Sequence, residues 1–170
     1  MAETFKEYVL QEKTKDKTIL NLGCGLGQVF ELMECKNHLC VDVWEPYLEQ
    51  IKFRFSVIKL NIKDLSIFID KSWDYVTAFD VVEHLEKPDA EKLLSECERI
   101  AREKVLVYTP VGFYKQEDGQ VNSWGAGNPE YQKHRCGFEL AEMLERGYDI
   151  KEVRAPGEAP ALSCIKKLYK

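Results

Sequence analysis

The 170-residue sequence lacks long apolar runs, an apolar leader and any C-x-x-C pair. Crossing a bilayer takes about 20 consecutive apolar residues, so we expect no membrane insertion. Residues 1–17 are polar and charged, which argues against a secretory signal and favours the cytoplasm. The six cysteines are scattered along the chain, so we expect reduced thiols and neither a zinc site nor a redox centre of the C-x-x-C type.

The sequence also has no excess of positive charge. It carries 24 Lys and Arg against 29 Asp and Glu, a net charge of −5. A nonspecific nucleic-acid partner needs a basic surface, so this balance disfavours one. The composition, 45% hydrophobic and 31% charged, is typical of a globular protein, and the length fits a single domain over residues 1–170. Nothing in the sequence decides the oligomeric state.

Two nucleotide-binding fingerprints are missing. There is no G-x-x-x-x-G-K-[ST] run, which excludes a P-loop. Gly23, Gly25 and Gly27 are spaced G-x-G-x-G. Gln28 then stands where a dinucleotide fingerprint has its last glycine, so a nicotinamide dehydrogenase is disfavoured.

The glycine turn nevertheless predicts a nucleoside site. It follows an apolar run over residues 18–22, and Asp42 comes 19 residues after Gly23. A strand that ends in closely spaced glycines lets the backbone approach a ligand, because no side chain occupies the space. An acid at this distance is suited to accept hydrogen bonds from ribose hydroxyls.

Apolar periodicity alternates between strand and helix along most of the chain, which is the pattern of a parallel sheet with helices on both faces. The predicted strands cover residues 18–22, 38–41, 56–60, 75–78, 105–108, 149–154 and 162–168. The predicted helices cover residues 27–34, 88–101 and 139–146, with a further short helix over residues 5–11.

Residues 109–136 show no sustained period and are broken repeatedly by glycine and proline. A long irregular connection inside a compact domain is often a lid or a binding loop, although a merely tolerated insertion is the alternative. The segment carries aromatic and polar side chains that could line a ligand site: Phe113, Tyr114, Trp124, Tyr131, His134 and Arg135. We expect the site of the second substrate here.

Several separate segments resemble the class I S-adenosylmethionine-dependent methyltransferases, over about residues 17–154. The similar segments are residues 20–27, 40–43, 61–65, 73–85 and 105–110. The segment 73–85 is most similar to the ubiquinone-type O-methyltransferases. The resemblance implies a Rossmann-like, doubly wound α/β fold with a seven-stranded sheet in the order 3-2-1-4-5-7-6, the last strand antiparallel and helices on both faces.

The same resemblance implies a binding site for S-adenosylmethionine, with S-adenosylhomocysteine as the product. It places these residues beside the cofactor: Gly23, Cys24, Gly25, Gly27, Asp42, Val43, Asn61, Ile62, Phe79 and Asp80. Asp42 would bind both ribose hydroxyls. Asn61 stands where an aspartate is more usual in the family, so which side chain touches adenine stays open.

The resemblance further implies methyl transfer to a small molecule, with oxygen as the expected acceptor. A hydroxyl acceptor must lose its proton, and His134 or His84 is the candidate base. RNA or protein methylation remains an alternative, as does an inactive module that binds the cofactor without turnover.

A divalent metal is a further alternative, because some relatives use an E-x-x-E-H element with metal to bind substrate hydroxyls. The corresponding element here is Asp80, Glu83 and His84, to which His134 could be added. The shorter side chain of Asp80 puts its direct ligation in doubt, which leaves Glu83, His84 and His134 as the candidate ligands. The simpler explanation is that Glu83 and His84 cap a turn and pair with their neighbours.

Overall fold

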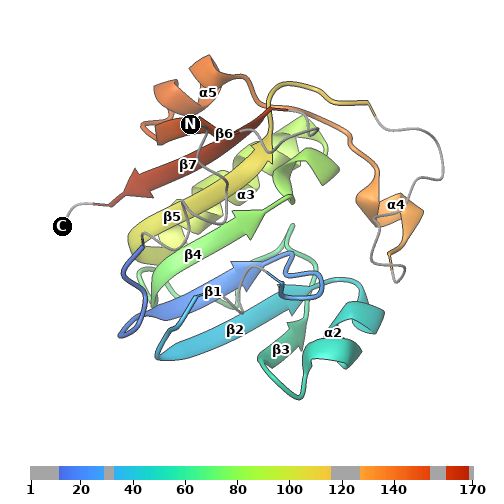
Figure 1. Cartoon of the computed structure of the whole chain (residues 1–170), viewed down its shortest axis with the longest axis vertical. Coiled ribbons are helices and arrows are strands. Elements are labelled where there is room, and N and C mark those ends of the chain that lie inside the picture. Colours follow the sequence, from blue (N-terminus) through green and yellow to red (C-terminus); the bar gives the residue numbers. More distant parts are fainter. Residues whose placement is uncertain (1–11, 29–32, 116–126, 154–159, 169–170) are drawn as a thin grey trace.

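The computed structural model describes residues 12–28, 33–115, 127–153 and 160–168. These residues form a seven-stranded sheet in the order β3-β2-β1-β4-β5-β7-β6, shown in Figure 1. The strands are β1 (Thr18–Leu22), β2 (Asn37–Asp42), β3 (Ser56–Lys59), β4 (Trp73–Phe79), β5 (Ala101–Pro110), β6 (Asp149–Val153) and β7 (Ala161–Lys167). The first five strands are parallel to one another and β7 runs antiparallel to β5 and β6, which confirms the predicted topology.

The central strands are apolar on both faces because both faces are covered. On one face, Leu20 and Leu22 of β1 belong to the main core with helix α3 (Lys87–Ile100). On the other face, Ile19 packs with Tyr75 and Leu106. Helix α3 begins with a proline in its first turn, and it buries one apolar stripe: Ala90, Leu93, Leu94, Cys97 and Ile100.

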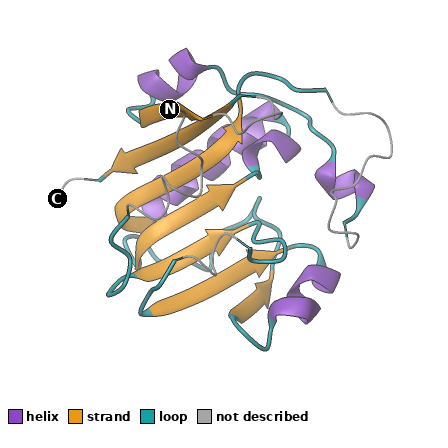
Figure 2. Cartoon of the chain, in the orientation of Figure 1, coloured by secondary structure: helices purple, strands orange, loops and turns teal. Residues whose placement is uncertain are grey.

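Helices lie on both sides of the sheet (Figure 2). Helix α2 (Glu45–Ile51) packs Leu48 and Ile51 against Cys40, on the face opposite α3. Helix α5 (Leu140–Glu145) contributes Met143 to the core on the α3 side. None of the helices in the described ranges has the length and apolarity that a membrane crossing requires.

The strand bounds differ from the predicted ones mainly at β4 and β5, which are longer. Strand β5 begins at Ala101, with charged residues over 102–104 that are not fully buried. One of them, Glu103, pairs with Lys17 at 2.7 Å. Charged strand ends of this kind have no apolar periodicity, so the sequence pattern did not predict them as strand. The predicted helix over 5–11 lies outside the described residues, as do residues 29–32 of the predicted helix over 27–34.

The parallel strands bring their carboxyl ends to one edge of the sheet, where ligands of open α/β sheets bind. The glycine turn after β1, the start of α2 and the short 3-10 helix η2 (Val82–His84) all lie at this edge. A small helix, α4 (Pro129–Gln132), lies beyond it, on the side toward which the arrowheads of β1, β2 and β4 point in Figure 1.

Candidate active site

A cavity of about 700 Å³ opens at the carboxyl edge of the sheet. It is lined by every residue predicted for cofactor contact: Gly23, Cys24, Gly25, Gly27, Asp42, Val43, Asn61, Ile62, Phe79 and Asp80. Glu83, His84 and His134 line the same cavity. The structure therefore brings the predicted cofactor, base and metal residues together, while their contacts with a ligand stay a prediction; Phe113 and Tyr114 are not part of the lining.

The glycine turn is held in a conformation that only glycine adopts easily. Gly23, Gly25 and Gly27 have φ angles of 67°, 52° and 72°. A Cβ at Gly23 would lie 2.5 Å from Cγ2 of Val81. The amides of Gly23 and Cys24 both donate to the carbonyl of Val41, at 2.8 and 3.0 Å. The turn is thereby fixed to β2 with bare backbone at the cavity wall.

Asp42 is buried at the end of β2, and both of its carboxylate oxygens are held by the backbone. Oδ2 accepts from the amide of Gly25 at 2.9 Å and Oδ1 from the amide of Trp44 at 2.8 Å. Burial raises the pKa of Asp42, and these backbone hydrogen bonds act in the opposite direction. The carboxylate cannot rotate without breaking them, so it is a fixed acceptor for hydroxyl donors in the cavity.

The end of β4 is strained at Asp80, which has a φ of 52° although it is not a glycine. Its amide donates to the carbonyl of Tyr108 at 2.9 Å, which holds this conformation against β5. Such residues cost on the order of 1–3 kcal/mol and tend to occur at functional sites. The strain at Asp80 therefore supports a functional site at this edge of the sheet.

Glu83 is buried and paired. Its Oε2 accepts from the hydroxyl of Thr109 at 3.0 Å, and only 2% of its surface is exposed. Burial, followed by the negative charge of Asp80, raises the pKa of the Glu83 carboxyl well above its ordinary value. Its backbone carbonyl accepts from the amides of Arg135 and Cys136, at 2.7 and 3.2 Å. These two bonds attach the chain that follows α4 to η2.

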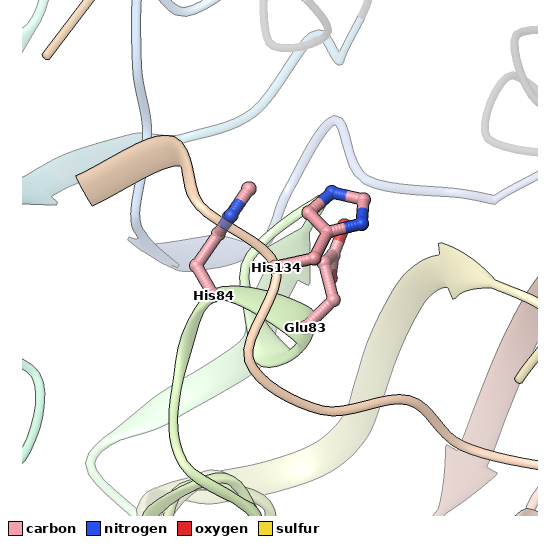
Figure 3. Close-up of side chains that lie close together, drawn as sticks. All are labelled: Glu83, His84 and His134. Atoms are coloured by element: carbon pink, nitrogen blue, oxygen red, sulfur yellow. The ribbon is translucent and has the colours of Figure 1, made fainter. Parts of the chain in front are cut away.

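His84 and His134 come from different segments and face each other, with ring centroids 5.0 Å apart. Figure 3 shows both beside Glu83. Nδ1 of His134 lies 2.7 Å from the carbonyl of Tyr114, and Nδ1 of His84 lies 3.4 Å from that of Lys133. A carbonyl can only accept, so Nδ1 of His134 carries the proton in the neutral ring and Nε2 carries the lone pair.

Both histidines are neutral near pH 7. Burial lowers the pKa of His84 to about 4, and burial also lowers the pKa of His134. A neutral imidazole can accept a proton or bind a metal ion without first losing a proton.

Glu83, His84 and His134 could also hold a metal ion. Among the described residues, one ligand atom from each lies within 4.8 Å of the others, and Asp80 is not part of this group. Two imidazoles and one carboxylate are a common ligand set for divalent transition metals. The pairing of Glu83 with Thr109 agrees equally with the simpler explanation, in which the acid is a structural partner.

The sequence predicted Tyr131 as a lining residue but gave no indication of Trp44, Tyr47 and Gln132, which lie beside it in the cavity wall. Nε2 of Gln132 donates to the Tyr47 hydroxyl at 2.8 Å, and the rings of Trp44 and Tyr131 lie 5.9 Å apart. All four residues line the cavity. Trp44 and Tyr47 follow Asp42 closely in the sequence, and this proximity could have indicated that they line the cavity. Trp124, which was also predicted to line a ligand site, lies outside the described residues.

The sequence is similar to a known family and to a protein of an archaeon. The model of a family described as a methyltransferase domain matches residues 20–109, more than half of the chain. An uncharacterized protein of Methanocaldococcus jannaschii is 32% identical over 110 residues, which are 62% of this chain and 47% of that protein. The chain thus spans about half the length of the curated relative it matches.

Solved structures share the fold. A Pyrococcus horikoshii protein superposes with a TM-score of 0.70 at 17% identity, over 97% of this chain and 88% of that one. The magnesium protoporphyrin IX methyltransferase of Synechocystis PCC 6803, solved with bound SAM, gives a TM-score of 0.63 at 11% identity, over 95% and 76% of the two chains. At these identities the likeness concerns the fold alone.

Proposed function

The chain belongs to the methyltransferase domain family, and from that membership we propose that it is an enzyme that transfers the methyl group of S-adenosylmethionine to a small-molecule acceptor. The observation that carries the proposal is the convergence of the glycine turn, Asp42 and the end of β4 on one cavity. The volume of about 700 Å³ lies within the usual range for small-molecule sites.

The residues present fit the cofactor. The exposed backbone of the glycine turn allows a nucleoside to approach closely, and the fixed carboxylate of Asp42 offers acceptors for both ribose hydroxyls. Asn61 and Ile62 lie on the lining of the same cavity and are the proposed adenine neighbours. Phe79 and Asp80 form the wall at the end of β4, nearer the histidines.

The sulfonium of S-adenosylmethionine supplies a methyl group that is already activated, so the protein mainly has to position the acceptor and exclude water. Positioning alone contributes on the order of 7 kcal/mol or more in favourable cases. We place the acceptor oxygen beside His134, where it would attack the methyl carbon in line with the departing sulfur. His134, neutral and with its lone pair on Nε2, would take the hydroxyl proton as the C–O bond forms and the C–S bond breaks.

A metal ion at Glu83, His84 and His134 is the second candidate for handling that proton. It is favoured by the 4.8 Å grouping of their ligand atoms and by the neutral histidines. A divalent ion there would lower the pKa of an acceptor hydroxyl bound to it. The two proposals differ in whether the protein binds a divalent ion at these three residues.

Acidic groups surround the acceptor side of the cavity and favour an uncharged or cationic acceptor. Asp80 and Glu86 line it, while the one arginine of the lining, Arg135, is paired with Glu130 and lies 3.6 Å from Glu86. A polyanion such as RNA would be repelled here, so we place RNA methylation second to a small molecule.

We also propose a cytoplasmic location. All six cysteines lie in the described residues and all are free thiols. Free thiols in this number are usual in the reducing cytoplasm and unusual in oxidising compartments.

Ligand-induced stabilisation tests the cofactor. A ligand at 100 times its Kd adds about 2.7 kcal/mol of stability, which raises Tm by roughly 5–10 °C for a chain of this size. We expect this shift with S-adenosylhomocysteine and none with NAD. The reverse result would replace the methyltransferase proposal with a dehydrogenase.

The acceptor is then sought with methyl-labelled S-adenosylmethionine incubated with separated small-molecule, RNA and protein fractions of a cell extract. Label in the small-molecule fraction supports the proposal, and label in RNA or protein moves the assignment to that class. Cofactor binding without transfer to any fraction would identify an inactive module.

A further inference from the structure

We propose that α4 is part of the cofactor site, closing the cavity over its ribose side and slowing release of the cofactor. The hydrogen bond between Gln132 and Tyr47 is one of the contacts that hold it closed. The inference rests on the proposed function, because it takes S-adenosylmethionine and S-adenosylhomocysteine as the occupants of the cavity.

Two consecutive residues of α4 reach across the cavity to the segment that carries the ribose-binding acid. Nε2 of Gln132 donates to the hydroxyl of Tyr47 at 2.8 Å, across 85 residues of sequence. The ring of Tyr131 lies 5.9 Å from that of Trp44, whose amide binds Asp42. Since these four side chains and Asp42 all line one cavity, α4 forms a wall beside the ribose position.

The chain that leaves α4 after Gln132 is attached to the acceptor side of the cavity. It is bound by the carbonyl of Glu83, which accepts from the amides of Arg135 and Cys136. Nη1 of Arg135 adds a second tie, because it donates to the carbonyl of His84 at 3.3 Å. The stretch from Gln132 to Arg135 therefore runs from the ribose side to η2, and a molecule in the cavity lies beneath it.

The four residues of α4 are not buried, and Tyr131 is 46% exposed. Segments with little buried apolar surface open locally at low free-energy cost. The Gln132–Tyr47 bond joins this exposed helix to α2, so its loss should have a measurable effect on release of the ligand.

Gly127 shows how closely Gln132 is packed from the opposite side. A Cβ at Gly127 would collide with the Oε1 atom of Gln132. The side-chain amide would have to move, and this movement would take Nε2 away from Tyr47. Gly127→Ala is thus a way to disturb the contact without removing either partner.

The experiment measures the dissociation rate of S-adenosylhomocysteine by stopped-flow competition. Loss of one neutral hydrogen bond changes an equilibrium constant by about threefold to tenfold. We expect Tyr47→Phe, Gln132→Ala and Gly127→Ala each to raise the dissociation rate by that factor. The double variant Tyr47→Phe/Gln132→Ala should be no faster than the faster single variant, because both changes remove the same bond.

Tyr148→Phe is the matched control, because it removes a hydroxyl that donates to Glu98 at 3.3 Å and it does not line the cavity. It should release the ligand at the wild-type rate. Wild-type release from Tyr47→Phe and Gln132→Ala, or additive effects in the double variant, would overturn the role of α4. A wild-type protein that does not bind S-adenosylhomocysteine would instead overturn the proposed function.

Discussion

Glu83 and Thr109 form a buried hydrogen bond between η2 and the end of β5, with Oγ1 and Oε2 3.0 Å apart. Thr109 is fully buried and Glu83 nearly so. A buried carboxyl with one neutral donor and a second acid beside it is poorly suited to carry a negative charge. The packing of η2 against β5 therefore favours the protonated form of the Glu83 carboxyl.

The first prediction concerns the pH dependence of stability in chelator-treated protein. The pKa of Glu83 is raised in the folded state, so its contribution to stability is present below the ordinary value of 4.5 and is lost as pH rises through the raised pKa. Glu83→Gln stays neutral and can still accept from Thr109. The unfolding free energy of Glu83→Gln minus that of the wild type should therefore increase with pH, by up to about 1.4 kcal/mol per pH unit.

Urea unfolding at several values between pH 5 and pH 8 measures this difference. Glu91→Gln, at an exposed position on α3, is the control and should differ from wild type equally at every pH. A difference for Glu83→Gln that does not change with pH would show that Glu83 is ionised in the folded protein.

The second prediction concerns Asp42. Asp42→Asn keeps the size of the side chain but leaves only one oxygen to accept from Gly25 and Trp44. It would also remove the charge-assisted bonds that we propose Asp42 makes to ribose. Loss of such bonds costs about 1.5–3 kcal/mol, so binding of S-adenosylhomocysteine should weaken roughly 10- to 100-fold. Isothermal titration calorimetry gives the Kd directly. The control is Asp16→Asn, since Asp16 is exposed and lies outside the cavity, and this variant should keep the wild-type Kd. A wild-type Kd in Asp42→Asn would show that Asp42 does not bind the ligand.

The cofactor half of the site was predictable from sequence because its signals are local. The glycine turn and Asp42 lie within about 20 residues, and each ends a strand that an apolar run identifies. The family resemblance predicted the strand order, and the apolar residues of β1 alone predicted its bounds.

The remaining half depends on contacts that no local pattern encodes. Tyr47 meets Gln132 across 85 residues and His84 approaches the carbonyl of Lys133 across 49, through a segment without period. The left-handed conformation of Asp80 is likewise accompanied by a bond from its amide to the carbonyl of Tyr108, which no local pattern predicts. The sequence did group His134 with Glu83 and His84 as candidate metal ligands, through the family resemblance, but the contacts that hold the two rings are set by the path of the whole chain.

The third prediction separates the metal from the base. If Glu83, His84 and His134 bind a divalent ion, titration calorimetry of apo-protein with Mg²⁺, Mn²⁺ or Zn²⁺ should show one site, with and without S-adenosylhomocysteine. His84→Ala should abolish that binding, because it removes one of three ligands. The control is His38→Ala, since His38 is distant in sequence and does not line the cavity. No heat of binding from the wild type with any of the three ions would refute the metal site.

The fourth prediction concerns His134 in the transfer reaction, measured once the labelled-cofactor screen has supplied an acceptor. A base must be deprotonated to act, and burial lowers the pKa of His134, so the wild-type rate should rise with pH and level off with a midpoint below the ordinary value of 6.5. His134→Ala should lower kcat by about 10²- to 10⁴-fold and remove this rise, with a Kd for S-adenosylhomocysteine near that of the wild type. His38→Ala is again the control and should keep the wild-type profile. An unchanged rate and pH profile in His134→Ala would show that the acceptor proton leaves by another route. If this variant still binds a metal ion, the ligands must be Glu83 and His84 without His134.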